Sequence, residues 1–249
     1  MHTKDSLIAQ LSAMLPSDAT VLMHSSCKSL GQMENGGDTI LDALTEYFSR
    51  GLVVLPTHTW ATVNDRQPVY DVLYTPVCIG LLPELFRKRP GVHRSWHPTH
   101  SVAAFGADAE EFVRGDENCP TPCARDSAWG RLYDRDAYVL LVGVELNRMT
   151  FFHGVEEWNG IPGRLKEMPN RYVVIPPDGG RIVRDYYPHC GDSSQLYPKA
   201  ETALLHAGAM RMEKLGDATV RLLSCRKSAE VVSSLLKDNP FFFGKAGYR

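Results

Sequence analysis

The chain of 249 residues lacks long apolar runs and blocks of like charge. Its longest apolar stretch, residues 138–144, is far too short to span a bilayer, and the first residues lack the apolar core of a signal peptide. The formal net charge of -2 gives no support for binding to nucleic acid or to a membrane. We therefore expect a cytoplasmic protein, a monomer or a homodimer, whose partners are small molecules.

Cysteines are few and follow no repeating framework. The six of them are expected to be reduced thiols, because no secretory leader is visible. The spacings His-x2-His and Cys-x3-Cys come within reach of a zinc site, but Pro98 breaks any helix that would present both histidines. We expect no bound metal. The residues weighed for such a site are His97, His100, Cys119, Cys123 and Cys190.

Three common catalytic and nucleotide-binding signatures are also missing. The chain has no Gly-x4-Gly-Lys-Ser/Thr loop, no Gly-x-Gly-x-x-Gly and no Gly-x-Ser-x-Gly elbow. A serine nucleophile therefore has no supporting motif, although Ser25, Ser26 and Ser101 offer hydroxyls. A thiol nucleophile at Cys27 stays open, because this residue follows a predicted strand within a loop of small residues.

What is present is a pattern of short buried strands and amphipathic helices, which predicts an α/β fold in a single domain over residues 1–249. Asp38 is expected to cap a helix, and residues 60–76 and 115–130 are expected to form loops. The predicted strands are 20–24, 52–55, 101–105, 138–144 and 219–224, with a hairpin over 172–186. The predicted helices are 6–15, 38–48, 79–88, 107–113, 200–215 and 228–237.

Polar side chains follow three of the buried strands. The clusters are His24-Ser25-Ser26, Thr57-His58-Thr59 and residues 147–153. Ligands of open α/β sheets collect at the carboxyl ends of strands, so these clusters are expected to converge on one site if the strands are neighbours. The loop after the first strand, residues 25–31, has Lys28 at its centre. It suits a phosphate group, although an ordinary strand-to-helix turn is an open alternative.

A second feature is an imidazole three residues before a carboxylate. His153 and Glu156 lie on one face if the segment begins a helix, and a carboxylate beside a histidine holds one tautomer and raises its basicity. Such a pair suits a general base that takes a proton near neutral pH. A surface helix pair is the plain alternative, but the flanking Phe151, Phe152 and Trp158 favour partial burial.

These segments occur together, in order, in one known family. The chain resembles the aminoglycoside 3-N-acetyltransferases, which have the antibiotic N-acetyltransferase fold. The match is strong over roughly residues 6–160 and looser beyond. It is carried by residues 24–31, Gly36-Gly37-Asp38-Thr39, residues 55–60, Tyr70-Asp71, Thr75-Pro76, residues 94–101, Thr121-Pro122-Cys123, residues 129–132, Gly143-Val144, residues 147–150, His153 and Glu156.

The resemblance implies a three-layer α/β/α sandwich with a mixed central sheet, unlike the GCN5-type acetyltransferases. It implies acetyl-CoA as cosubstrate and an amine acceptor, classically the 3-amino group of deoxystreptamine. His153 and Glu156 would be the catalytic base and its partner, with Thr59 and Ser101 at the acyl end. Trp60, Asp71 and Glu157 would contact the acceptor. The implied coenzyme contacts are His24, Ser25, Ser26, Cys27, Lys28, Ser29, Leu30, Gly31 and His100.

The mechanism implied is direct transfer in a ternary complex. His153 removes a proton from the amine, the amine attacks the thioester, and donors near Ser101 or in the first loop stabilise the oxyanion. Cys27 would then be a bystander. Residues 157–163 and the tail diverge from the resistance enzymes, so the resemblance defines the reaction more closely than the acceptor. The alternatives are a CoA-dependent N-acyltransferase of natural-product metabolism, and a non-catalytic CoA-binding or metal-binding protein.

Overall fold

A mixed seven-stranded sheet forms the centre of the protein. The computed structural model describes residues 1–244. β1 runs parallel to both of its neighbours, β2 and β6, and the other pairs in the sheet are antiparallel. In spatial order the strands are β4 (His93–Arg94), β5 (Val102–Gly106), β2 (Leu52–Pro56), β1 (Thr20–Ser25), β6 (Tyr138–Val142), β10 (Ala218–Ser224) and β9 (Met210–Leu215).

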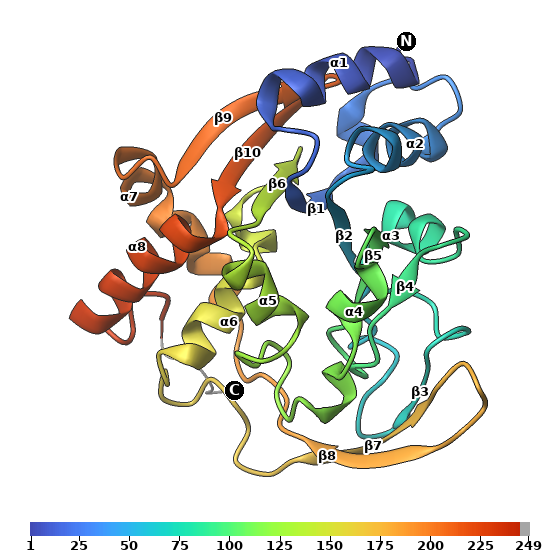
Figure 1. The fold of residues 1–249 in the computed structure, drawn as a ribbon. Coiled ribbons are helices and arrows are strands. Elements are labelled where there is room, and N and C mark those ends of the chain that lie inside the picture. The colour runs from blue at the N-terminus through green and yellow to red at the C-terminus, as the bar shows by residue number, and fades with distance from the viewer. Residues whose placement is uncertain (245–249) are drawn as a thin grey trace.

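Helices cover both faces of this sheet (Figure 1). Successive side chains of a strand point to opposite faces, so Val21 and Met23 join one core and Leu22 joins the other. One face carries α1 (Lys4–Met14), α2 (Gly37–Tyr47) and α3 (Leu81–Phe86). The other carries α4 (Ala109–Val113), α5 (Ala128–Asp134), α6 (Phe151–Trp158), α7 (Glu201–His206) and α8 (Cys225–Asp238).

A small second sheet lies apart from the large one, at the bottom of the view in Figure 1. Its strands, in spatial order, are β3 (Val69–Asp71), β7 (Asn170–Ile175) and β8 (Ile182–Tyr186). It has its own apolar cluster, which includes Tyr70, Tyr172 and Tyr186. The hydroxyl of Tyr70 donates to the carbonyl of Ser95 at 3.0 Å, which ties this sheet to the end of the large one.

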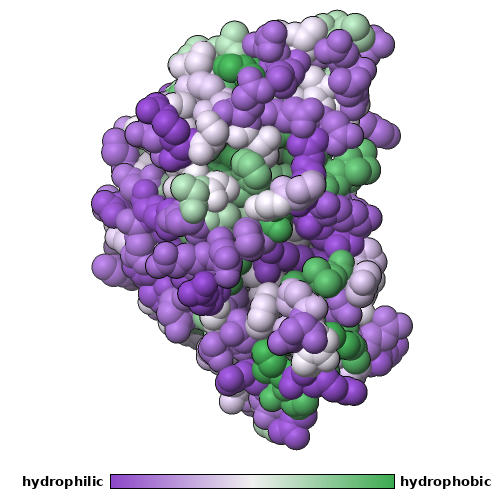
Figure 2. Space-filling model, turned by 45° about the vertical axis from the view of Figure 1, so that its right-hand side comes forward, coloured by the Kyte–Doolittle hydropathy of each residue, from purple (hydrophilic) through white to green (hydrophobic). Residues whose placement is uncertain are grey.

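Short 3-10 helices fill the connections. They are η1 (Cys27–Leu30), η2 (Asp116–Asn118), η3 (Leu146–Arg148) and η4 (Ser193–Ala200). No helix in residues 1–244 is long and apolar enough to cross a membrane. The face drawn in Figure 2 is mostly hydrophilic, and its hydrophobic side chains gather in separate patches.

Several predicted boundaries are wrong. The predicted helix 200–215 is two elements, because Gly208, with φ 62, ends α7 and the chain returns as β9. α5 begins within the predicted loop 115–130, where the hydroxyl of Ser127 caps its first turn. Asp38 does not cap α2, whose N-cap is Gly36; its carboxylate instead pairs with Arg89 at 2.6 Å.

Candidate active site

A cavity of about 920 Å³ opens at the carboxyl ends of the parallel strands. His24 and Ser25 reach it from the end of β1, and His58 and Trp60 reach it from the segment after β2. The segment after β6 contributes residues from Val144 to His153. The structure therefore brings together the three polar clusters that follow the buried strands. The reason is that β2, β1 and β6 are adjacent and parallel, so their ends meet at one edge.

His153 lies on this cavity and is held from behind through its Nδ1 atom. It sits in the first turns of α6, an amphipathic helix whose Phe151, Phe152 and Val155 are fully buried. The hydroxyl of Tyr197 is hydrogen-bonded to Nδ1. Nη2 of Arg164 lies 2.8 Å from the same nitrogen, and Oε2 of Glu156 lies 3.4 Å from it. All three contacts are made at Nδ1, so the ring is anchored at one nitrogen.

Glu156 is buried at the centre of this group and is well supplied with donors. Its Oε2 accepts hydrogen bonds from the hydroxyls of Tyr197 at 2.6 Å and Ser193 at 3.0 Å. Nε of Arg164 completes an ion pair with the same oxygen at 3.2 Å. Burial works against ionisation, but the contacts with His153, Arg164 and Tyr197 outweigh it and lower the pKa of Glu156. The carboxylate is therefore charged at neutral pH.

The imidazole of His153 is neutral at physiological pH. Burial, followed by the nearby positive charge of Arg164, lowers its pKa to about 4, although Glu156 opposes the shift. A neutral imidazole has one nitrogen with a free lone pair and can accept a proton. His153 can therefore accept a proton at neutral pH, but the rise in basicity expected from Glu156 is wrong, because burial and Arg164 outweigh it.

Four further histidines form a chain of rings with His153. The ring centroids of His153 and His189 are 5.0 Å apart, those of His189 and His100 are 5.0 Å apart, and His58 and His97 also pack against His100. Burial lowers the pKa of each of the four, so they are neutral as well. The wall beside His153 is therefore polar but carries little charge from these rings.

The segment from Arg94 to Ser101 is largely a scaffold. The guanidinium of Arg94 is buried and donates to the carbonyls of Thr57, Val72 and Thr75 at 2.7–3.1 Å. Nδ1 of His97 accepts a backbone N–H from His100 at 3.1 Å. These bonds fix the turn that places His100 on the cavity.

Two hydroxyls predicted for the acyl end lie behind the wall. The Ser101 hydroxyl bonds to the carbonyl of Thr57 at 2.8 Å, and the Thr59 hydroxyl bonds to the carbonyl of Pro98. Both residues are fully buried and neither lines the cavity. The two hydroxyl groups already donate to protein carbonyls, so neither is free to bind a ligand in the cavity.

The predicted coenzyme loop reaches the cavity only at its start. His24 and Ser25 line it, whereas Ser26, Cys27, Lys28, Ser29, Leu30 and Gly31 do not. Ser29 bonds back to the carbonyl of Ser26 at 2.7 Å and Leu30 is fully buried in the core. The backbone turns sharply at Gly31, with φ 84. The Lys28 side chain is exposed.

The three residues predicted for the acceptor have different positions. Trp60 lines the cavity and is half exposed. The carboxylate of Asp71 caps the turn after β3 by accepting two backbone N–H bonds at 2.8–2.9 Å. Glu157 accepts from the backbone N–H of Cys123 at 2.9 Å and also bonds to Thr121 and His189. Asp71 and Glu157 do not line the cavity.

The side chains that could together hold a metal ion differ from those suggested by the sequence. Within residues 1–244, the group whose ligand atoms all lie within 4.8 Å of one another is Cys123, Glu157 and His189. Of the residues weighed from the sequence, only Cys123 belongs to it. Burial raises the pKa of the Cys123 thiol well above its usual range, and the Glu157 carboxylate already has hydrogen-bond partners. The three side chains therefore have the hydrogen bonds and burial that are typical of residues packed in a protein interior.

Sequence reasoning missed most of the residues behind His153. Arg164, Ser193 and Tyr197 lie 8 to 41 positions beyond Glu156 and belong to no motif. Arg164 follows a segment without a recognisable pattern, and the sequence of η4, which carries Ser193 and Tyr197, predicts no helix or strand. The aromatic character of Tyr197 is the one signal of burial there, and it is equally typical of a core position.

Known proteins share both the sequence and the fold. The model of the family described as aminoglycoside 3-N-acetyltransferase matches residues 22–237. The SPbeta prophage-derived aminoglycoside N(3')-acetyltransferase-like protein YokD of Bacillus subtilis is 28% identical, over 96% of this chain and 93% of that protein. Aminoglycoside N(3)-acetyltransferase VII of Streptomyces paromomycinus is 29% identical, over 74% of this chain and 70% of that protein.

Solved structures agree with this match. The crystal structure of YokD from Bacillus subtilis has a TM-score of 0.82 at 26% identity, with 96% of this chain and 94% of that chain covered. A mutant of aminoglycoside acetyltransferase AAC(3)-IVa in complex with a gentamicin has a TM-score of 0.84 at 26% identity, with 97% and 90% covered. AAC-IIIb, solved with CoASH, shares the fold at a TM-score of 0.83 and 24% identity, with 100% and 98% covered. The predicted fold is confirmed, and the chain belongs to the aminoglycoside 3-N-acetyltransferase family.

Proposed function

We propose that this protein transfers the acetyl group of acetyl-CoA to an amine, with His153 as the general base. The observation that carries the proposal is the anchoring of one imidazole nitrogen by Tyr197, Glu156 and Arg164. His153 also lies on the cavity of about 920 Å³, a volume typical of small-molecule sites. Family membership supports the reaction class.

The tautomer of His153 follows from the hydrogen bonds behind it. The Tyr197 hydroxyl donates its proton to Glu156 at 2.6 Å, which leaves the phenol oxygen free to accept from Nδ1–H. A guanidinium can only donate, so Arg164 favours the opposite tautomer. Nη1 and Nε of Arg164 are held elsewhere, by the carbonyl of Cys190 at 2.9 Å and by the Glu156 carboxylate, so the guanidinium stays anchored if Nη2 gives up its contact with Nδ1. We infer that the proton is on Nδ1 and that the lone pair of Nε2 faces the acceptor.

The chemical step then balances. The acceptor nitrogen loses a proton to Nε2 of His153 and attacks the thioester carbonyl, so that a C–N bond forms. The tetrahedral intermediate collapses, the C–S bond breaks, and the coenzyme A thiolate takes the proton from Nε2, which returns His153 to its neutral form. No protein nucleophile is required, so the thiols of Cys27 and Cys78 play no covalent part. The buried hydroxyls of Thr59 and Ser101 stabilise the cavity wall through their bonds to protein carbonyls, and they do not stabilise the oxyanion of the intermediate.

Coenzyme A is proposed to enter beside the end of β1. Ser25 and His24 line that part of the cavity, together with Arg148 from η3, whose charge suits a phosphate group. The relative from Streptomyces paromomycinus is named an aminoglycoside N(3)-acetyltransferase, so an aminoglycoside amine is the first acceptor to try.

The test is a thiol-release assay with acetyl-CoA and a panel of amines. Acceptor-dependent release of free CoA, lost in His153→Ala while that variant still binds CoA by calorimetry, supports the proposal. Release with a non-aminoglycoside amine alone favours the natural-product alternative. CoA binding without release on any acceptor would instead indicate a non-catalytic protein. Undiminished turnover in His153→Ala would exclude it as the base.

A further inference from the structure

The cavity wall has to supply a hydrogen-bond donor for the oxyanion of the intermediate. Attack on the thioester leaves a negative charge on the carbonyl oxygen, and a preorganised donor close to that oxygen lowers the barrier. The hydroxyls of Thr59 and Ser101 are bonded to protein carbonyls, and neither residue lines the cavity. The donor must therefore be another group on the wall.

Two free hydroxyls lie on the cavity. Among residues 1–244, five residues with a hydroxyl group line it. Three of these hydroxyls, those of Thr99, Tyr172 and Ser194, have neighbouring side chains as partners at 2.9–3.0 Å. The other two belong to Ser25 and Thr150, and neither has a hydrogen-bond partner in the part of the chain that the structure describes.

Thr150 directly precedes the first turn of α6, yet its side chain does not cap this helix. A threonine at this position normally has an extended backbone and accepts a backbone N–H two or three residues later. Here Thr150 has the helical angles φ -55 and ψ -30, and its side chain accepts no such bond. The N–H of His153, three residues later, instead donates to the carbonyl of Thr150 at 2.9 Å. The hydroxyl is thus left free for a ligand.

The Thr150 hydroxyl is nearly buried but still open to the cavity. The residue is 8% exposed and lines the cavity, and its oxygen is not among the fully covered side-chain atoms that lack a partner. A hydroxyl in such a place has lost most of its water without gaining a protein partner. A negatively charged oxygen that accepts its hydrogen bond would be stabilised more than in open solvent.

Thr150 also lies close to the base. Thr150 and His153 are three residues apart at the start of one helix, so their side chains are neighbours, and both residues line the cavity. The N-terminus of α6, a helix of eight residues, carries a partial positive charge that favours a negative one nearby. Ser25 lies at the end of β1, beside the proposed position of coenzyme A. Thr150 is therefore the free hydroxyl on the element that carries the base.

We propose that the Thr150 hydroxyl is the oxyanion donor of the transfer. As the amine nitrogen bonds to the carbonyl carbon, the π electrons of the carbonyl move to its oxygen. Thr150 donates a hydrogen bond to this oxygen and keeps its own proton. When the C–S bond breaks, the carbonyl forms again and the hydrogen bond weakens. The inference rests on the proposed acetyl transfer.

The first test removes the hydroxyl and keeps the shape of the side chain. Thr150→Val should lower kcat about 10²- to 10³-fold and leave KM for acetyl-CoA within about twofold, because the donor acts in the transition state. Thr150→Ser keeps the hydroxyl and should stay within about fivefold of the wild-type kcat. Because Thr150 makes no capping bond, both variants should unfold at the same urea concentration as the wild type.

Thr45→Val is the matched control for the loss of a threonine hydroxyl. The Thr45 hydroxyl donates to the carbonyl of Leu41 at 3.0 Å within α2, which covers the opposite face of the sheet. This variant should keep its kcat.

A second test changes the carbonyl oxygen itself. Dithioacetyl-CoA carries sulfur at that position, and sulfur is a weak hydrogen-bond acceptor. The ratio of kcat between the wild type and Thr150→Val should therefore shrink by at least about tenfold with this analogue. Ser25→Ala removes the other free hydroxyl, and its ratio to the wild type should be the same with both thioesters. A purely structural role of Thr150 would likewise give equal ratios.

The outcomes separate the inference from the proposed function. If the wild type releases CoA and Thr150→Val keeps kcat within about threefold, Thr150 is not the donor. A raised KM at unchanged kcat, or equal ratios for Thr150→Val with both thioesters, would also overturn the inference and leave acetyl transfer intact. Absence of CoA release by the wild type with every acceptor would overturn the proposed function itself.

Discussion

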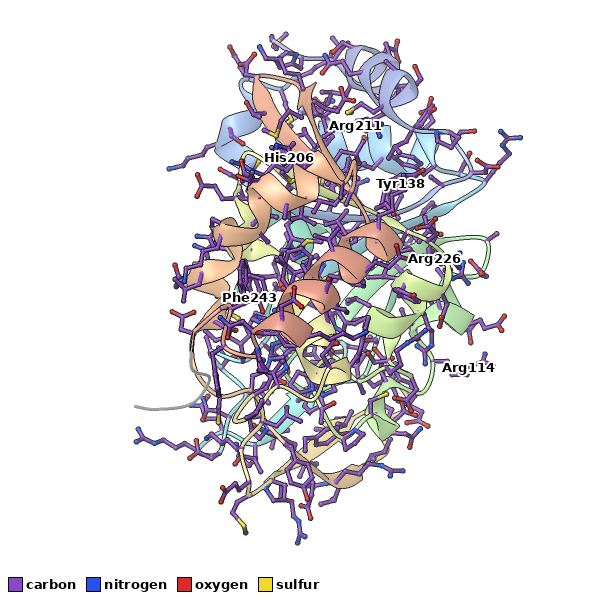
Figure 3. The ribbon with its side chains drawn as sticks, turned by 90° about the vertical axis from the view of Figure 1, so that its left-hand side faces the viewer. Arg114, Tyr138, His206, Arg211, Arg226 and Phe243 are labelled. Atoms are coloured by element: carbon purple, nitrogen blue, oxygen red, sulfur yellow. The ribbon has the colours of Figure 1, made fainter. Side chains whose placement is uncertain are left out.

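Replacing Tyr197 by Phe removes one oxygen atom from the contacts that orient His153. The ring is fully buried and packs edge-on against Phe152 and Phe243, with ring centroids 5.5 and 4.8 Å away. Phe243 follows α8 (Figure 3). Phenylalanine preserves this packing, so the variant should fold. The change leaves Nδ1 of His153 with Arg164 as its nearest partner at 2.8 Å.

The expected loss follows from the tautomer. Arg164 can only donate to Nδ1, which drives the imidazole proton to Nε2 and removes the lone pair that accepts the acceptor's proton. A hydrogen bond to a charged group is worth about 1.5–3 kcal/mol. If the tautomer balance shifts by that amount, kcat falls roughly 10- to 150-fold. KM for acetyl-CoA should stay within about twofold of the wild-type value, because Tyr197 does not line the cavity.

The assay is steady-state CoA release, with unfolding by urea measured in parallel. Tyr47→Phe is the control: its hydroxyl donates to the carbonyl of Leu15 at 2.6 Å on the opposite face of the sheet. This variant should lose about 0.5–1.5 kcal/mol of stability and keep its kcat. A Tyr197→Phe enzyme with kcat within about twofold of wild type would refute the proposed tautomer.

Four further outcomes are expected. His153→Ala should lower kcat about 10²- to 10⁴-fold with an unchanged circular dichroism spectrum; a smaller loss would point to another base. Because the His153 pKa is about 4 and only the neutral ring accepts a proton, kcat/KM for an amine that stays protonated should fall only below about pH 4, and Arg164→Gln should move this limb to higher pH. If kcat/KM of the wild type instead falls near pH 6.5, the ordinary histidine pKa, then burial and Arg164 do not lower the pKa of His153. Arg94→Met strands three buried carbonyls and should lower the free energy of unfolding by about 3 kcal/mol in urea titrations. Gly143→Ala places a Cβ against the side chain of Ser29 at a residue with φ +62, so it should lower the free energy of unfolding by about 1–2 kcal/mol in urea titrations; a variant as stable as the wild type would contradict this close approach.

The sequence predicts the cavity edge well because local rules govern it. Short runs such as 52–55 and 138–142 are continuously apolar, which is typical of strands buried on both faces. The polar residues that follow them must then lie at the carboxyl ends. The pair His153 and Glu156 is predictable for the same reason, since one turn of helix brings i and i+3 together.

Side-chain direction and distant partners are not predictable in this way. Asp71 and Glu157 are acidic residues near the motifs, yet local turns and loops use their carboxylates. Arg164 and Tyr197 reach His153 through tertiary packing, for which spacing gives no signal. The helix predicted over 200–215 fails because tertiary pairing with β10 outweighs helical periodicity.

The contact of Tyr197 with Phe243 means that the surroundings of His153 are completed by residues synthesised long after it. Arg164 follows His153 by 11 residues and Tyr197 follows it by 44, and Phe243, which packs against Tyr197, is synthesised later still. β10, which pairs with β6, and α8, which packs on α6, are also synthesised after α6. A nascent chain that ends at α6 holds His153 and Glu156 without the side chains of Arg164 and Tyr197 that contact them. The surroundings of His153 are therefore complete only once Phe243 has been added.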